Sequence, residues 1–160
     1  MESTAATDAN DRRRILIVED DDRLRGVIVR NLVARGFVVD EARTVEAACS
    51  QSAIEEPSLV FLDIELPDGT GWEFLDTLAV RGCRPAVVIV SAVHARPERI
   101  AAFSPLAVLH KPFPLESLLR LAAEWAGRVP PTLSADGEHG LGEWGTIGVA
   151  ADAQSDAPHT

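Results

Sequence analysis

Acidic side chains follow two apolar runs of this sequence, and they are the first candidates for chemistry. The run 59–62 ends at Asp63, and the run 14–18 ends at Glu19 and Asp20. Short apolar runs rich in strand formers and bounded by turn formers are typical of strands buried on both faces. Acids at the carboxyl ends of such strands lie where open α/β sheets place their sites. Asp is also common in turns, so Asp63 taken alone fits a simple strand end equally well.

Two later apolar runs end in other groups that could contact a phosphate. The run 85–90 is followed by Ser91, and the run 107–110 is followed by Lys111. Lys111 is the single lysine in a chain with fourteen arginines, and its compact charge suits a phosphoryl oxygen better than a planar guanidinium does. A serine after a strand often only closes a turn, and a lone lysine can be an ordinary surface residue. Neither residue alone therefore indicates a phosphate site, and the assignment depends on the other motifs of the chain.

Helical patterns alternate with these runs and set the expected architecture. The first helix begins at Arg23, carries apolar residues at helical spacing and ends at Gly36. Thr70 and Glu73 form the pattern of a capping box, in which each side chain binds an N–H group at the helix start. Further helices are expected at 44–56, 70–81, 94–103 and 114–128, and a further strand at 37–39. Five strands that each precede a helix predict an α/β fold with one parallel sheet and helices on both faces.

A parallel sheet brings the carboxyl ends of its strands to one edge, so the five polar side chains named above should converge there. Three carboxylates close together repel one another and ordinarily need a cation. A site built from oxygen atoms suits Mg²⁺, with Mn²⁺ as a substitute. The metal ion and Lys111 would neutralise a phosphoryl group on Asp63, while the hydroxyl of Ser91 donates a hydrogen bond to it. The predicted chemistry is phosphoryl transfer.

Length and composition limit the other classes of protein. A chain of 160 residues has room for one ordinary domain with appendages. No uncharged apolar run reaches the roughly 18 residues of a membrane span, and the N-terminus lacks the pattern of a signal peptide. We therefore expect a cytoplasmic protein without membrane contact. The net charge of −10 argues against direct binding to DNA or other nucleic acid.

The composition divides the chain into three parts. Residues 1–13 are expected to form a flexible N-terminal segment, and residues 14–128 the folded domain. Residues 129–160 form an acidic tail rich in Gly, Ala and Pro, with five acids and neither Lys nor Arg. We expect this tail to be mostly disordered, with 141–149 as its one apolar segment.

Four segments together resemble the receiver domain of two-component response regulators. They are 15–21 (ILIVEDD), 61–71 (FLDIELPDGTG), 88–92 (VIVSA) and 110–113 (HKPF), and they occur in the order and approximate spacing of that family. Each motif alone is modest, whereas four in order are specific. The resemblance covers residues 14–128. It implies a flavodoxin-like fold of five βα units, a doubly wound parallel sheet of strand order 2-1-3-4-5.

The same resemblance implies a phosphorelay site. Asp63 would accept a phosphoryl group from a sensor histidine kinase or a phosphotransfer protein. Mg²⁺ would be bound by Asp20, Asp63 and the backbone carbonyl of Glu65, with Glu19 assisting through water. The protein would not be an enzyme, apart from assisting its own phosphorylation and dephosphorylation.

The resemblance also assigns roles on the neighbouring strands. Ser91, together with Ala92, and Lys111 would bind the phosphoryl group and act in the switch. The peptide bond between Lys111 and Pro112 would be cis. The family usually has an aromatic residue three positions before the lysine, and this sequence has Val108 there.

A second departure affects the surface through which such proteins commonly signal. The stretch 91–111 is shorter than usual and contains Pro97 and Pro105, so its helix should be short. Phosphorylation is therefore better supported than the usual relay from serine to aromatic residue. We expect output through another surface or through a partner that contacts the site directly. Since 129–160 is too short for a DNA-binding or kinase module, the sequence predicts a stand-alone receiver that contacts an unknown downstream protein.

Two other readings stay open at this level. A phosphohydrolase of the haloacid dehalogenase type also has an aspartate nucleophile after an apolar strand and an acid two residues later, as in Asp63 and Glu65. That family places its nucleophile on the first strand and its acidic pair late in the chain, which is the reverse of the order here. The other alternative is a binding module that keeps the receiver fold and signals without phosphorylation.

Overall fold

The apolar runs form the central sheet of the computed structural model, which describes residues 13–128. Its strands are parallel and lie in the order β2-β1-β3-β6-β7. Counted over this sheet alone, the order is 2-1-3-4-5, so the expected fold class and strand order are confirmed. The central strand is β3, and all of its residues are buried. The strands are β1 (Arg14–Val18), β2 (Val38–Ala42), β3 (Leu59–Asp63), β6 (Ala86–Ser91) and β7 (Ala107–His110).

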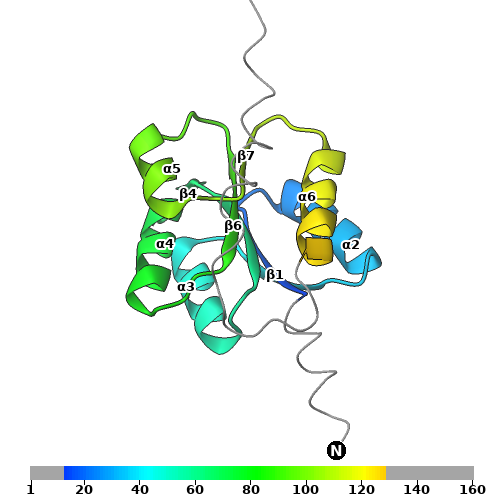
Figure 1. Ribbon diagram of the computed structural model, residues 1–160, viewed down its shortest axis with the longest axis horizontal. Coiled ribbons are helices and arrows are strands. Elements are labelled where there is room, and N and C mark those ends of the chain that lie inside the picture. The colour runs from blue at the N-terminus through cyan, green and yellow to red at the C-terminus, as the bar shows by residue number, and fades with distance from the viewer. Residues whose placement is uncertain (1–12, 129–160) are drawn as a thin grey trace, which may run out of the picture.

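Helices cover both faces of the sheet (Figure 1). One layer contains α2 (Asp22–Ala34) and α6 (Leu115–Arg128). The other contains α3 (Val45–Ile54), α4 (Gly71–Val80) and α5 (Pro97–Phe103). Because the five strands are parallel, they all end at the same edge of the sheet. Each connection between consecutive strands of this sheet contains a helix.

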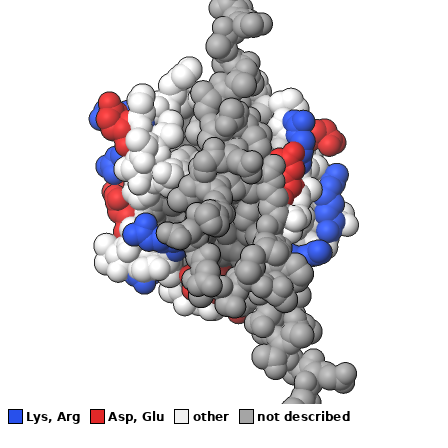
Figure 2. Space-filling view, viewed as in Figure 1, with Lys and Arg blue, Asp and Glu red and all other residues white. Residues whose placement is uncertain are grey.

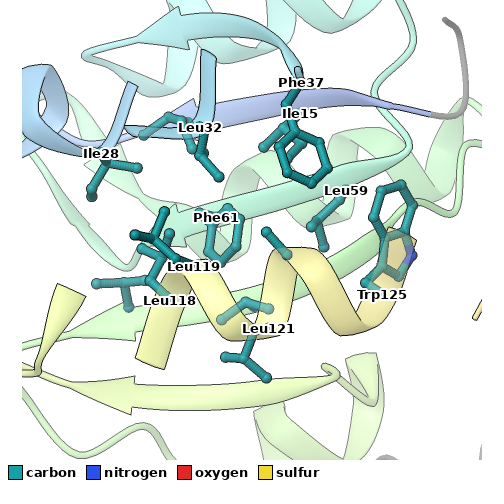
Figure 3. Packing of buried hydrophobic residues seen from close by; sticks show 14 of the residues in the cluster. Ile15, Ile28, Leu32, Phe37, Leu59, Phe61, Leu118, Leu119, Leu121 and Trp125 are labelled. Carbon is teal, nitrogen blue, oxygen red and sulfur yellow. The ribbon is translucent and has the colours of Figure 1, made fainter. Parts of the chain in front are cut away.

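Alternate residues of each strand pack into opposite layers, as the period of two of a β-strand requires. In β3, Leu59 and Phe61 face α2 and α6, whereas Val60 and Leu62 face the other layer. Figure 3 shows Phe61 among the side chains of the first layer, beside Leu118 and Leu119 of α6. Both faces of β3 are therefore apolar, and its carboxyl end is held rigidly by packing.

The second strand differs from the predicted range 37–39. It extends to Ala42 and includes Asp40 and Glu41. These two adjacent acids interrupt the apolar run from which the strand is predicted. This strand is one of the two edge strands of the sheet, so its polar residues can reach partners at the surface. Asp40 lies 2.9 Å from a guanidinium nitrogen of Arg14, and Glu41 lies 3.0 Å from one of Arg25.

The loop after β3 contains a small hairpin that the sequence pattern did not predict. It consists of β4 (Glu65–Leu66) and β5 (Gly69–Thr70), paired antiparallel around Pro67 and Asp68. The capping box of Thr70 and Glu73 is present at the start of α4, as expected. Helix α5 begins at Pro97, three residues later than expected, with the proline in its first turn.

Two ends of the chain lie outside the described residues. They are 1–12 and 129–160. The expected flexible N-terminal segment and the acidic tail, with its apolar segment 141–149, therefore stay predictions. Among the residues that the structure describes, none of the helices is long and apolar enough to span a membrane.

Candidate functional site

Charged side chains from three strand ends meet at the carboxyl edge of the sheet. The ammonium group of Lys111, just after β7, lies 2.7 Å from a carboxylate oxygen of Glu19 and 3.0 Å from one of Asp63. One oxygen each from Glu19, Asp20 and Asp63 lies within 4.8 Å of the others. The structure thus brings together the four charged residues that the sequence placed at one edge.

Glu19 is the most perturbed acid of this cluster. Its side chain is only 3% exposed. Burial raises the pKa of Glu19 to about 7, and the hydrogen bond from Lys111 offsets only part of that effect. The backbone N–H of Asp21 also donates to Glu19, whereas the nearby charge of Asp63 raises the pKa further. Burial is thus the main reason why this carboxyl group holds its proton more tightly than an exposed glutamate does.

Lys111 stays cationic in this setting. Burial lowers the pKa of Lys111, but its hydrogen bonds to Glu19 and Asp63 outweigh burial, so the pKa lies above its ordinary value. The side chain of Lys111 is about one-fifth exposed, so solvent can reach this part of the cluster. A positive charge at this point can attract an incoming anion while it holds Asp63 in place.

The backbone after β3 fixes the position of Asp63. The N–H of Glu65 donates to Oδ1 of Asp63 at 3.0 Å, while Oδ2 receives the hydrogen bond from Lys111. The N–H of Gly71 donates to the carbonyl oxygen of Ile64 at 2.8 Å and closes the loop. The Asp63 carboxylate is therefore held through both of its oxygens.

Gly71 packs so closely against β3 that a larger residue cannot fit without movement. A Cβ atom at this position would lie 2.6 Å from the carbonyl oxygen of Asp63 and 3.0 Å from Cγ of Leu62. We expect Gly71→Ala to lower the free energy of unfolding by about 1–3 kcal/mol, because the backbone of β3 or the loop must shift. Chemical denaturation would measure the loss.

Gly127 supplies the matched control for this substitution. A Cβ atom there would meet nothing within 4 Å. Gly127→Ala lies in α6 and should be neutral or stabilise the protein by up to about 1 kcal/mol, since alanine favours a helix. Equal stability of the two variants would contradict the close packing inferred at Gly71.

Asp68 has a structural role that the sequence did not reveal. Its two carboxylate oxygens accept hydrogen bonds from the backbone N–H groups of Val45 and Glu46 at 2.8 and 3.0 Å. These are the first N–H groups of α3, where Thr44 also accepts from Ala47. A carboxylate at a helix N-terminus stabilises free N–H groups. Asp68 thereby fastens the loop after Asp63 to a separate helix.

This capping contact predicts a pH effect on stability. The hydrogen bonds from Glu46 and Val45 lower the pKa of Asp68 below its ordinary value of 3.8. A lowered pKa in the folded state means that the contact stabilises the protein above pH 3.8 and is lost as the pH falls through the folded value. We expect Asp68→Ala to lower the melting temperature by a few degrees at pH 7. The difference from the wild type should shrink in thermal melts on approach to pH 3, and a constant difference would contradict the role of the charge.

The remaining predicted residues lie on β6 and β7. Ser91 is buried at the end of β6, and its backbone carbonyl accepts a hydrogen bond from the N–H of Lys111 at 2.8 Å. Its hydroxyl oxygen accepts a hydrogen bond from the N–H of Val93 at 3.2 Å. Ala92 is exposed, and the peptide bond between Lys111 and Pro112 is cis.

Val108 lies in β7 and contacts the apolar layer beneath α4 and α5. It is half-buried there, in the same cluster as Trp72 and Phe103. The rings of Trp72 and Phe103 are stacked with centroids 5.7 Å apart. This aromatic pair joins α4 to α5, and nothing in the sequence pattern indicated it.

The donor set of the cluster fits a hard divalent cation. The three carboxylates supply oxygen ligands, which Mg²⁺ and Mn²⁺ prefer. The three carboxylates face a single lysine, and like charges so close together repel one another, so a further cation would be favourable. Asp20 and Glu65 are exposed, which leaves an approach from solvent. The arrangement can thus bind a metal ion and a phosphoryl group beside the Asp63 carboxylate.

Comparison with known proteins points to one family. Residues 15–123 match the response regulator receiver domain. The KDP operon transcriptional regulatory protein KdpE of Escherichia coli is 36% identical over 113 residues, which are 68% of this chain and 50% of KdpE. Response regulator MprA of Mycolicibacterium vanbaalenii is 33% identical over 66% of this chain and 47% of MprA. The chain spans about half the length of these relatives.

Solved structures agree with the sequence match. The CheY-like response regulator receiver domain protein of Methanospirillum hungatei is 28% identical, with a TM-score of 0.62. The similarity covers 72% of this chain and 94% of that protein. The Francisella response regulator 1452 receiver domain has a TM-score of 0.66 at 19% identity, over 74% of this chain and 99% of that one, and supports the fold alone.

Proposed function

The chain belongs to the response regulator receiver domain family of two-component systems, and we propose that it accepts a phosphoryl group on Asp63. The donor would be a sensor histidine kinase or a phosphotransfer protein. One observation carries this proposal: Asp63 ends the central strand, is nearly buried, and lies between the only lysine of the chain and two further acids. A carboxylate held in this way is suited to attack phosphorus.

Each residue of the cluster has a part in the proposed transfer. A carboxylate oxygen of Asp63 forms the new P–O bond while the bond from phosphorus to the donor breaks and the donor keeps its electron pair. Lys111 neutralises charge on the phosphoryl oxygens, and the hydroxyl of Ser91 donates a hydrogen bond to one of them.

Receiver domains bind Mg²⁺ at an acidic pocket, and the acidic cluster of this chain is the counterpart. We place the ion at Asp20, Asp63 and the backbone carbonyl of Glu65, with Glu19 assisting through water. When bound, it would reduce the repulsion between the carboxylates and the incoming phosphoryl group. The chain's own residues hold and orient the nucleophile.

Output is proposed to occur through contact with a downstream protein. KdpE is named a transcriptional regulatory protein, but that name describes a protein of which this chain spans half. In the described part of the visible face, basic and acidic side chains are interspersed on both helical layers (Figure 2). Such a mixture does not favour a nucleic acid backbone. With Val108 in place of an aromatic residue and with a short α5, we favour a partner that contacts the site edge directly.

The proposal is tested by incubating the protein with a small phosphodonor, such as acetyl phosphate, and measuring its intact mass. We expect a gain of one phosphoryl group in the presence of Mg²⁺, loss of that gain with a chelator, and its removal by hydroxylamine, which cleaves acyl phosphates. A folded protein that gains no mass would instead favour a binding module that works without phosphorylation.

A further inference from the structure

Two histidines lie side by side at the edge of the sheet, outside the acidic cluster. His110 is the last residue of β7, and His94 lies in the loop between β6 and α5. Their ring centroids are 5.0 Å apart and their planes are inclined by 33°. These are the two histidines that the described part of the chain contains; His139 and His159 lie outside it. The proposed phosphoryl transfer uses neither ring.

The backbone holds the two rings in this arrangement. His110 pairs with Ser91 in the register of β6 and β7. The hydroxyl oxygen of Ser91 accepts from the N–H of Val93, and this bond turns the loop at the point where His94 follows. His110 is half-buried and His94 is exposed, so one ring is anchored and the other can adjust.

The ring nitrogens of both histidines have no partner among the described residues. Within residues 13–128, neither side chain forms a hydrogen bond or an ion pair. Neutral imidazole is a common ligand of divalent transition metals.

From this geometry we propose that His94 and His110 form a two-histidine site for a divalent transition-metal ion, with Zn²⁺ as the best fit. A tetrahedral ion with Zn–N bonds of about 2.0–2.1 Å sets the centroids of two ligating imidazoles roughly 5 Å apart. The ring centroids here are 5.0 Å apart, so the two rings already have the spacing that a shared ion requires. Water molecules complete the coordination, since the site faces solvent.

The site differs in chemistry from the acidic cluster. The cluster offers carboxylate oxygens, which suit Mg²⁺, whereas the histidine pair offers nitrogen, which suits Zn²⁺. An excess of Mg²⁺ should therefore occupy the first without competing for the second. The two sites can be filled separately.

An ion at this position would link two elements of the phosphorylation site. His94 follows Ser91 by three residues, and His110 directly precedes Lys111. Resting on the proposed function, we expect bound Zn²⁺ to hold the Ser91 loop against β7. Any movement of Ser91 on phosphorylation would then change the affinity for Zn²⁺. By linkage, bound Zn²⁺ would change the equilibrium constant of phosphorylation by the same factor.

The test is a calorimetric titration of the unphosphorylated full chain with Zn²⁺ in excess Mg²⁺. Because His139 and His159 could also bind zinc, the starting protein is the double variant His139→Gln/His159→Gln. We expect one Zn²⁺ per chain, and a roughly tenfold or greater loss of affinity in either His94→Gln or His110→Gln made on that background. Circular dichroism would verify that these variants are folded.

Three results would overturn the site. The first is that the double variant binds no zinc, and the second is that its affinity for zinc survives substitution of both His94 and His110. The third is a ratio of one ion per two chains together with a dimer in analytical ultracentrifugation, because the ion would then join two chains. The titration uses protein without a phosphoryl group. A failure of phosphorylation at Asp63 would therefore leave its result unchanged, and the two proposals can fail independently.

Discussion

Asp63→Asn is expected to abolish phosphoryl incorporation while leaving the fold intact. The amide has nearly the shape of the carboxylate, and its oxygen can still accept the hydrogen bond from the N–H of Glu65. It lacks the anionic oxygen that forms the new bond to phosphorus. Lys111 keeps its second partner, Glu19, at 2.7 Å, so the cation is not left alone. The expected loss in rate is at least about a thousandfold, as for other removed nucleophiles.

The control for this experiment is the other aspartate of the same loop. Asp68 is exposed and binds the start of α3, so Asp68→Asn removes an equal charge without touching the nucleophile. Intact mass after incubation with the phosphodonor and Mg²⁺ should show phosphoryl gain in the wild type and in Asp68→Asn. It should show none in Asp63→Asn. If Asp63→Asn gains as much mass as the wild type, another residue is the acceptor and the proposed site is wrong.

The convergence of the charged residues could be predicted because it follows from the backbone alone. Parallel strands end on one side, so apolar runs that stop at Glu19, Asp63 and Ser91 bring those residues together whatever the details of packing. Lys111 could be placed there by the same reasoning. The strand order itself came from the resemblance to receiver domains, since periodicity does not choose between arrangements of five strands.

Other features depend on side-chain contacts between distant segments and left no periodic signal. Asp68 binds N–H groups that lie more than twenty residues earlier in the chain. In β2, Asp40 and Glu41 read as polar loop residues, because their arginine partners lie on other elements. The facing rings of His94 and His110 arise from a loop turning back over a strand. Motif spacing cannot show such contacts, because they are formed only after the sheet and helices have packed.

Lys111→Met should lower the stability of the protein as well as the rate of phosphoryl transfer. Glu19 and Asp63 have side chains only 3% and 5% exposed, and methionine would leave both carboxylates without their cationic partner. Removing one partner of a buried ion pair costs about 3 kcal/mol or more in the free energy of unfolding. We expect a loss of that order at pH 8 without divalent cations, measured by chemical denaturation. Lys111→Arg keeps the charge and should lose less.

The loss caused by Lys111→Met should depend on pH with a definite sign. In the wild type, burial raises the pKa of Glu19 from 4.5 to about 7, so between these values the folded state binds a proton that the unfolded state does not. Stability therefore rises as the pH falls from about 7 towards 4.5. Without Lys111 the pKa of Glu19 should rise further, because the hydrogen bond that lowers it is gone. The deficit of Lys111→Met should consequently shrink on acidification.

Mg²⁺ distinguishes this electrostatic explanation from a simple packing defect. An ion bound among the carboxylates replaces the missing positive charge, so millimolar Mg²⁺ at pH 8 should restore much of the stability of Lys111→Met. The same addition should raise the stability of the wild type less, since its cluster already contains one cation. Phosphoryl transfer should stay slow in the rescued variant, because methionine cannot neutralise the phosphoryl oxygens. A deficit unchanged by both pH and Mg²⁺ would mean that Lys111 stabilises the protein through the packing of its aliphatic stem.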